Sequence, residues 1–223
     1  MSEVKEFLEA LEAVERYILY LEIRSVGHIY FGWAFGALIM GLFGFFSKPL
    51  EKITGVPSSL IFIFVGIIVS IIVFVLSDKG FAAARRLKIS RAPPEKRGEI
   101  IAKVRKFNIM TALIWSLTSI IFFSICFSFK RFSYYYFMVS LLSTLGFGNL
   151  AMSLVHRWLL EELIVESFWV GVFLLISTLI TLTLIFFGLF YASSIFSILS
   201  IFVIYLVAGL YAYSKAFKVL EGK

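Results

Sequence analysis

Few side chains in this sequence are of types that could carry out chemistry. The histidines are His28 and His156, and Cys126 is the single cysteine. Two neutral imidazoles can ligate a haem or a metal ion, which makes His28 and His156 one candidate ligand pair. The alternative is that both histidines only form hydrogen bonds at the lipid headgroups. We favour that alternative, and we expect no bound metal and no cofactor. One cysteine forms neither an intrachain disulfide nor a Cys-based metal site.

The apolar parts of the chain lack the charged residues that many transporters and pumps require. The long apolar runs contain no Asp, Glu, Lys or Arg, and ion-coupled transporters, proton pumps and voltage sensors generally need such groups. The sequence has no Gly-x-Ser-x-Gly motif, no Gly-rich phosphate loop and no His-Glu-x-x-His pair, so we do not expect an enzyme. Asn149 is an amide inside an apolar run, and it either bonds across helices or marks a pathway.

The composition indicates which elements must position these residues. The chain of 223 residues is 61% hydrophobic and 16% charged, whereas a soluble domain carries about 25% charged residues. A chain of this size cannot bury so much apolar surface. The sequence therefore predicts an all-α polytopic membrane protein.

Charge-free runs locate the spans. A spanning helix needs about 20 apolar residues, and the last run is long enough for two helices with a turn near Gly188–Ser193. We therefore predict six transmembrane helices. The runs cover residues 25–47, 53–77, 107–129, 132–156 and 167–214.

The basic residues predict the orientation. All of them except Lys48, Lys52, Lys130 and Arg131 fall on one side of the proposed spans. Lys and Arg accumulate in cytosolic loops, so we expect both termini to be cytosolic in a multi-pass protein of the cell membrane. The chain contains no glutamine and little asparagine. This depletion is typical of a thermophile, although membrane proteins are in any case poor in amides.

The chain divides into five segments. They are residues 1–24, an acidic amphipathic helix; 25–77, the first two spans; 78–108, a basic cytosolic loop with a short helix; 109–214, the other four spans; and 215–223, a cytosolic tail.

The first segment carries an apolar seam with heptad spacing. Its net charge over residues 2–24 is minus three. Membrane-binding amphipathic helices usually carry Lys and Arg on the polar face, so an acidic face favours contact with protein. The alternative is packing against the protein's own helix bundle. The seam consists of Val4, Phe7, Leu11, Val14, Ile18 and Leu21.

The basic segment 78–108 has a net charge of plus seven. Pro93 and Pro94 break the chain, and we expect a new short helix there, because proline suits a first turn. The charge fits ordinary headgroup binding on the cytosolic side, which is the interpretation we favour. It also fits docking onto the acidic N-terminal helix or an acidic partner, with Arg85, Arg86 and Arg97 as candidates. We expect no nucleic-acid partner, because no nucleic-acid-binding motif accompanies the charge.

Small residues mark the surfaces where helices could pack closely. Gly residues in a membrane helix let a second backbone approach, and we expect this property to support a homo-oligomer or a stable membrane-complex partner. The candidate packing residues are Gly32, Gly36, Gly41 and Gly44 in the first span, and Gly146, Gly148 and Asn149 in the fourth.

The layout resembles the membrane subunits, or permeases, of some ATP-binding-cassette exporters. The shared features are an amphipathic helix before the first span, six spans, both ends inside, and a cytosolic segment between spans two and three. The resemblance implies that residues 78–108 contact a cytosolic ATPase. It leaves open two functions: a transport subunit that lacks its own ATPase, or a non-transporting scaffold of a larger complex. The only other partners that we expect are membrane lipids.

Overall fold

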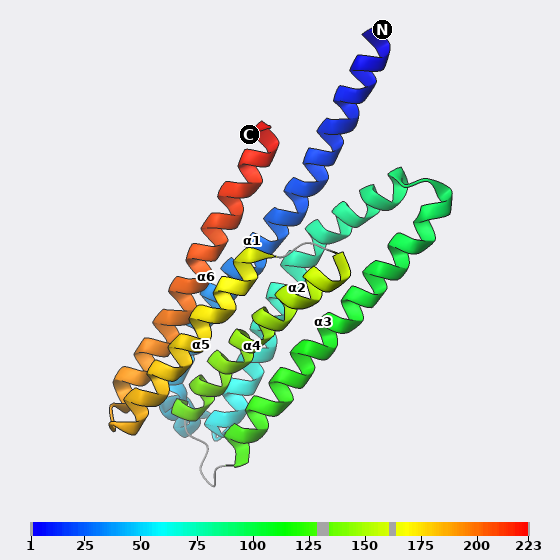
Figure 1. Ribbon diagram of the computed structural model, residues 1–223. Coiled ribbons are helices and arrows are strands. Elements are labelled where there is room, and N and C mark those ends of the chain that lie inside the picture. Colours follow the sequence, from blue (N-terminus) through cyan, green and yellow to red (C-terminus); the bar gives the residue numbers. More distant parts are fainter. Residues whose placement is uncertain (1, 129–133, 161–163, 223) are drawn as a thin grey trace.

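Six long helices make up the described part of the protein (Figure 1). The computed structural model describes residues 2–128, 134–160 and 164–222, and this part of the chain contains no strand. The helices are α1 (Ser2–Thr54), α2 (Ser58–Arg91), α3 (Pro94–Ser128), α4 (Tyr134–Leu160), α5 (Val165–Phe186) and α6 (Phe190–Glu221).

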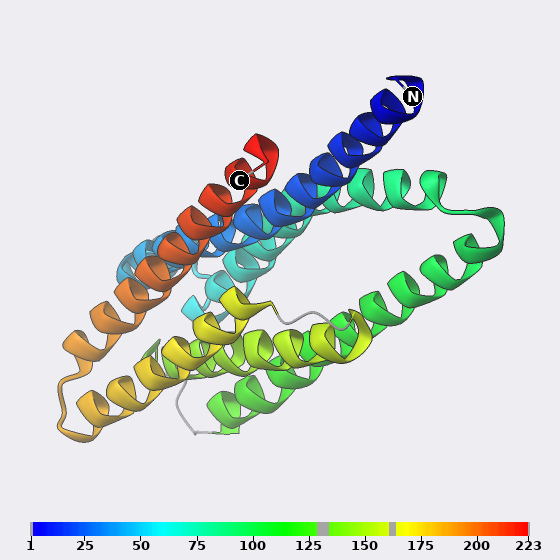
Figure 2. The same cartoon turned by 45° about the horizontal axis from the view of Figure 1, so that its top comes forward.

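The helices pack in the order α2, α1, α6, α5, α4 and α3. Helix α4 also touches α6, whereas α2 and α3 meet only sparsely although they are neighbours in sequence. Figure 2 shows these two helices diverging from their common end. The bundle is therefore an open arc whose two edges are α2 and α3.

Within residues 2–128, 134–160 and 164–222, five helices are long and apolar enough to cross a membrane. The qualifying segments within the described residues are Val4–Gly44, Phe64–Arg91, Tyr135–Leu159, Val165–Phe186 and Phe190–Glu221. An all-helical protein with several candidate spans agrees with the prediction. The expected span 107–129 lies on α3 as far as Ser128, residue 129 lies outside the described residues, and the count of six stays a prediction.

Two helices are longer than the sequence suggested. Helix α1 runs without a break from the acidic segment through the first apolar run, and it continues past Pro49 to Thr54. The charge-free runs placed the break between the first two spans at residues 48–52, but α1 includes these residues and only residues 55–57 connect it to α2. Gly55, with φ +70°, adopts a left-handed conformation that glycine tolerates best.

Helix α3 likewise begins at Pro94 and continues into the apolar run, so the expected short helix and the third expected span are one element. No glycine or proline interrupts residues 99–128, and an unbroken helix satisfies every interior backbone group.

The core lies where α1, α4, α5 and α6 meet. Ala34, Leu142, Leu174 and Ile201 are fully buried there, one from each of these helices. The helices α5 and α6 form a hairpin, because only residues 187–189 connect them. These residues begin the expected turn region, and Gly188 has φ +74°.

Candidate functional site

The first turns of α1 stand clear of the other helices (Figures 1 and 2). Val4, Phe7 and Leu8 are 64%, 67% and 55% exposed. From Val4 to Tyr17 no residue is buried, and Ile18 is the first buried side chain. We call residues 4–17 the projecting segment. Among the described residues, no other helix covers its first apolar side chains.

The root of the projecting segment is braced by α2. Lys88 on α2 forms an ion pair with Glu22 at 2.6 Å. Arg91 lies 3.9 Å from Glu15 and donates a hydrogen bond to the carbonyl oxygen of Leu11 at 3.3 Å. Exposed ion pairs contribute about 0–1 kcal/mol each, so these contacts orient the segment more than they stabilise it.

The predicted docking arginines have different surroundings. The Arg85 guanidinium pairs with Asp78 at 2.8 Å within α2, and Arg86 is exposed. Arg97 donates hydrogen bonds to carbonyl oxygens of residues 92 and 90, at 2.9 and 3.3 Å, so it satisfies carbonyl groups at the α2–α3 corner. The basic side chains that contact the N-terminal helix are those of Lys88 and Arg91, and sequence reasoning selected neither as a docking residue.

The beginning of α3 adds further exposed charge beside this corner. Lys103 lies 3.0 Å from Glu99. The hydrogen bond from Lys103 holds the pKa of the Glu99 carboxyl below its usual range. Both side chains are more than half exposed, so this pair leaves the basic character of the segment in place.

The burial of the heptad seam differs between its N-terminal and C-terminal halves. Ile18 is buried, and Leu11 and Leu21 are half-buried. Val4 and Phe7 are exposed, and Val14 lies at the limit of exposure. The N-terminal half of the seam is therefore the part that is free for a partner.

The C-terminal half of the seam packs within the protein's own bundle. Beside it, the ring of Tyr20 lies near Phe217 of α6, with ring centroids 6.3 Å apart. One turn later the α1 side chain Ser25 is buried against Gly80 of α2. The structure thus shows packing against the protein's own bundle for this half, and partner contact at the N-terminal half stays a prediction.

Asn149 is the centre of a buried hydrogen-bond network. Its Nδ2 donates to the hydroxyl oxygen of Tyr205 on α6 at 2.7 Å, and to the carbonyl oxygen of Leu145 at 2.7 Å. Ser167 on α5 donates to the backbone oxygen of Asn149 at 3.0 Å, with Oδ1 at 3.2 Å. Tyr30 of α1 lies beside Tyr205, with ring centroids 5.8 Å apart. Asn149 therefore bonds across helices, which is one of its two predicted roles.

Most other hydroxyls bond within their own helix. Thr111, Thr118 and Thr178 donate to carbonyl oxygens one turn earlier. Two buried hydroxyls on α4, Thr144 and Ser153, have no hydrogen-bond partner among the described residues. Buried polar groups are nearly always bonded, so these two atoms are unusual.

The two histidines lie in separate environments. His28 on α1 packs edge-on against Tyr213 of α6 at 5.6 Å, and His156 on α4 packs edge-on against Phe107 of α3 at 5.7 Å. Within the described residues no cluster of three or more His, Cys, Asp or Glu side chains could surround a metal ion. The structure thus gives each histidine an aromatic neighbour on a different helix.

Gly32 and Gly36, in the expected first span, face α2 of the same chain. A Cβ atom added to Gly32 would lie 2.7 Å from Val73, and one added to Gly36 would collide with Val69. We expected a second copy or a partner against this surface. Helix α2 already occupies it, because the short α1–α2 connection folds α2 back along α1.

The next glycine of α1 faces a different neighbour. A Cβ atom added to Gly41 would lie 2.7 Å from Ile198 of α6. Gly44 follows about one turn later and is half-buried. The glycines of α1 therefore serve contacts with both of its neighbouring helices.

The glycines of α4 also lie at close helix contacts. A Cβ atom added to Gly146 would lie 2.7 Å from Leu175 of α5, and one added to Gly148 would lie 2.5 Å from the Trp115 ring of α3. Helix α4 therefore approaches both neighbours closely at this level. The same part of α4 holds Asn149, so close packing and the polar network occur together.

Some residues of these sites could not be selected from the sequence. Tyr30, Ser167 and Tyr205 belong to the network around Asn149, yet they resemble many other hydroxyl residues in apolar runs. For Tyr205 the sequence did offer a signal, namely its position far from the expected membrane surfaces. A buried phenol usually needs a hydrogen-bond partner.

Comparison with known proteins adds no family to this description. No protein-family model, no curated protein and no solved structure matches the chain.

Proposed function

We propose that this protein is the membrane-embedded docking subunit of a larger complex, and that the projecting segment binds a cytosolic partner. The observation that carries the proposal is the exposure of Val4, Phe7 and Leu8 on a helix that is braced at its root. Exposed apolar side chains gathered on one helix commonly mark an interaction surface.

The chemistry of the segment describes the partner. A partner with an apolar groove and a basic rim would match this surface, as in other helix-in-groove complexes. The charges would guide orientation, and the apolar side chains would supply most of the affinity. The charged residues of the segment are mostly acidic: Glu6, Glu9, Glu12 and Glu15, with Lys5 and Arg16 as the basic ones.

The test is co-purification from solubilised membranes of the source cells. Phe7→Asp places a charge on the apolar face and should abolish recovery of the partner. Ala13→Asp is the matched control, because Ala13 is exposed on the same segment but lies on the other side of the helix, at about 100° per residue. Equal recovery of the same partner with both variants would contradict the proposal.

A transport subunit that works with a separate ATPase is the second candidate. The buried hydroxyls of Thr144 and Ser153, which find no hydrogen-bond partner in the part of the chain that the structure describes, favour it, since a bound water or a substrate could supply the missing partner. The layout resemblance to exporter permeases supports the same function.

Transport by reconstituted vesicles separates the two candidates. If the co-purified partner is an ATPase, Ser153→Val should reduce transport without reducing partner recovery. Unchanged transport in this variant would leave docking as the supported function.

A further inference from the structure

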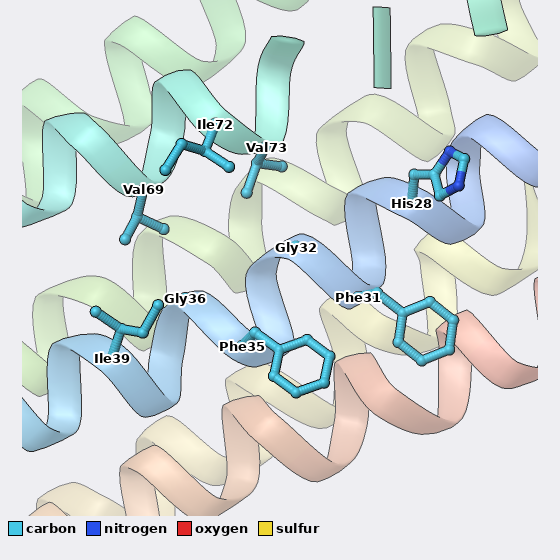
Figure 3. A pocket seen from close by; sticks show the side chains of 9 residues that line it. All are labelled: His28, Phe31, Gly32, Phe35, Gly36, Ile39, Val69, Ile72 and Val73. Carbon is cyan, nitrogen blue, oxygen red and sulfur yellow. The ribbon is translucent and has the colours of Figure 1, made fainter. Parts of the chain in front are cut away.

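A groove of about 430 Å³ runs along the outer side of the α1–α2 pair (Figure 3). Gly32 and Gly36 form its floor, and Phe35, Ile39 and Ile72 form exposed walls. His28 lies at one end of the row (Figure 3). The groove is apolar along its length except at this end.

The length of the groove matches one leaflet of a bilayer. From His28 to Ile39 the helix rises about 16 Å, at 1.5 Å per residue, and half of the hydrocarbon core is about 15 Å thick. The groove also lies within Val4–Gly44 and Phe64–Arg91, both candidate spans. Its position therefore suits an acyl chain.

Positive charge gathers at the His28 end. Arg24 lies one turn before His28, on the same face of α1, and its exposed guanidinium donates to the Tyr20 hydroxyl at 3.2 Å. On α2, Lys79 is exposed and lies two turns beyond Ile72 on the same face. Lys79 also adjoins Gly80, which packs against Ser25 of α1. Both cations are thus at the level of the groove mouth.

We propose that this groove binds one acyl chain of an anionic phospholipid, whose phosphate is held by Arg24, Lys79 and His28. The exposed side chains of Phe35, Ile39 and Ile72 contact the acyl chain, and the two cations select the headgroup. This site is independent of the projecting segment.

The chain-binding part is tested by native mass spectrometry of the detergent-purified protein with phosphatidylglycerol. Ile72→Trp fills the groove, and it should reduce the retained lipid about tenfold. Ile71→Trp is the matched control, because Ile71 is similarly exposed on α2 but does not line the groove. Equal lipid retention by the two variants would overturn the proposal.

The headgroup part is tested by comparing phosphatidylglycerol with phosphatidylcholine of identical chains. The protein should retain more phosphatidylglycerol than phosphatidylcholine. The double variant Arg24→Gln with Lys79→Gln should reduce this preference about tenfold. Arg86→Gln with Lys96→Gln is the control, since both residues are exposed elsewhere at the same end. No preference in the wild type, or equal losses in both double variants, would overturn the proposal.

The same spectra distinguish a lipid from a second copy of the chain. Conversion of a dimer to a monomer by Ile72→Trp, without lipid loss, would identify the groove as a protein interface and would also overturn the proposal.

Discussion

At the residue scale, Asn149 joins three helices through one side chain and one backbone oxygen. It contacts Tyr205 on α6 and Ser167 on α5 while remaining on α4. In a bilayer core no water replaces a lost partner, so a buried amide that is bonded across helices favours one arrangement of those helices.

We predict that Asn149→Leu lowers the thermal stability of the detergent-purified protein. The substitution removes the amide donor to the Tyr205 hydroxyl and the Oδ1 atom near Ser167, at a cost of about 1–3 kcal/mol. Asn108→Leu makes the same chemical change at an exposed position and should leave the melting temperature nearly unchanged. Equal melting temperatures for the two variants would show that the network does not stabilise the bundle.

The sequence predicted Asn149 as a polar contact but could not name its partners. Amides are rare in this chain, whereas hydroxyls are common, so only the arrangement of α5 and α6 distinguishes Ser167 and Tyr205. Arg91 was missed for the same reason: its bond to Leu11 joins residues 80 positions apart, and local spacing does not report such contacts.

At the element scale, the α1–α2 hairpin depends on glycine. Gly32 and Gly36 allow Val73 and Val69 to approach the α1 backbone. The spacing of the glycines predicted close packing, but not whether the neighbour would be another copy or the next helix.

We predict that Gly36→Ala destabilises the α1–α2 contact. The added methyl group would collide with Val69, so one helix must move or a rotamer must change, at a cost of typically about 1–3 kcal/mol. Gly66→Ala is the matched control on α2, because its Cβ would only reach Met40 at 3.8 Å. In thermal unfolding, Gly36→Ala should have a lower melting temperature than Gly66→Ala. A higher melting temperature for Gly36→Ala would contradict the close approach of α1 and α2.

The continuity of α1 was the main element-scale feature that the sequence did not reveal. An isolated helix as short as the projecting segment would be marginal in water, because nucleation is costly. Here the segment extends a helix that is already formed, so it avoids that cost. The acidic residues near its N-terminus also suit the helix dipole.

At the scale of the whole molecule, composition and the charge-free runs were sufficient to predict an all-helical protein with several apolar helices. They could not predict the open arc, because every apolar helix offers several faces and lipid can cover any of them. The sparse contact between α2 and α3 follows from three-dimensional packing alone.

We predict that the connection between α2 and α3 faces the cytosol. In a Cys126→Ser background, Ser90→Cys should be shielded from an impermeant thiol reagent in intact cells, and Lys52→Cys should react. Permeabilised cells should label both positions, which controls for local accessibility. The reverse pattern in intact cells would contradict the positive-inside orientation.

The unbroken α1 also sets a distance. Between His28 and Val4 the helix rises about 36 Å, so a partner bound at Val4 would sit at a fixed height above the groove. Removing seven residues would lower that height by about 10 Å and turn the binding face by only about 20°. Removing five would turn it by about 140°. The length of the helix therefore sets both the height and the direction of the binding face. Partner binding should tolerate removal of seven residues far better than removal of five.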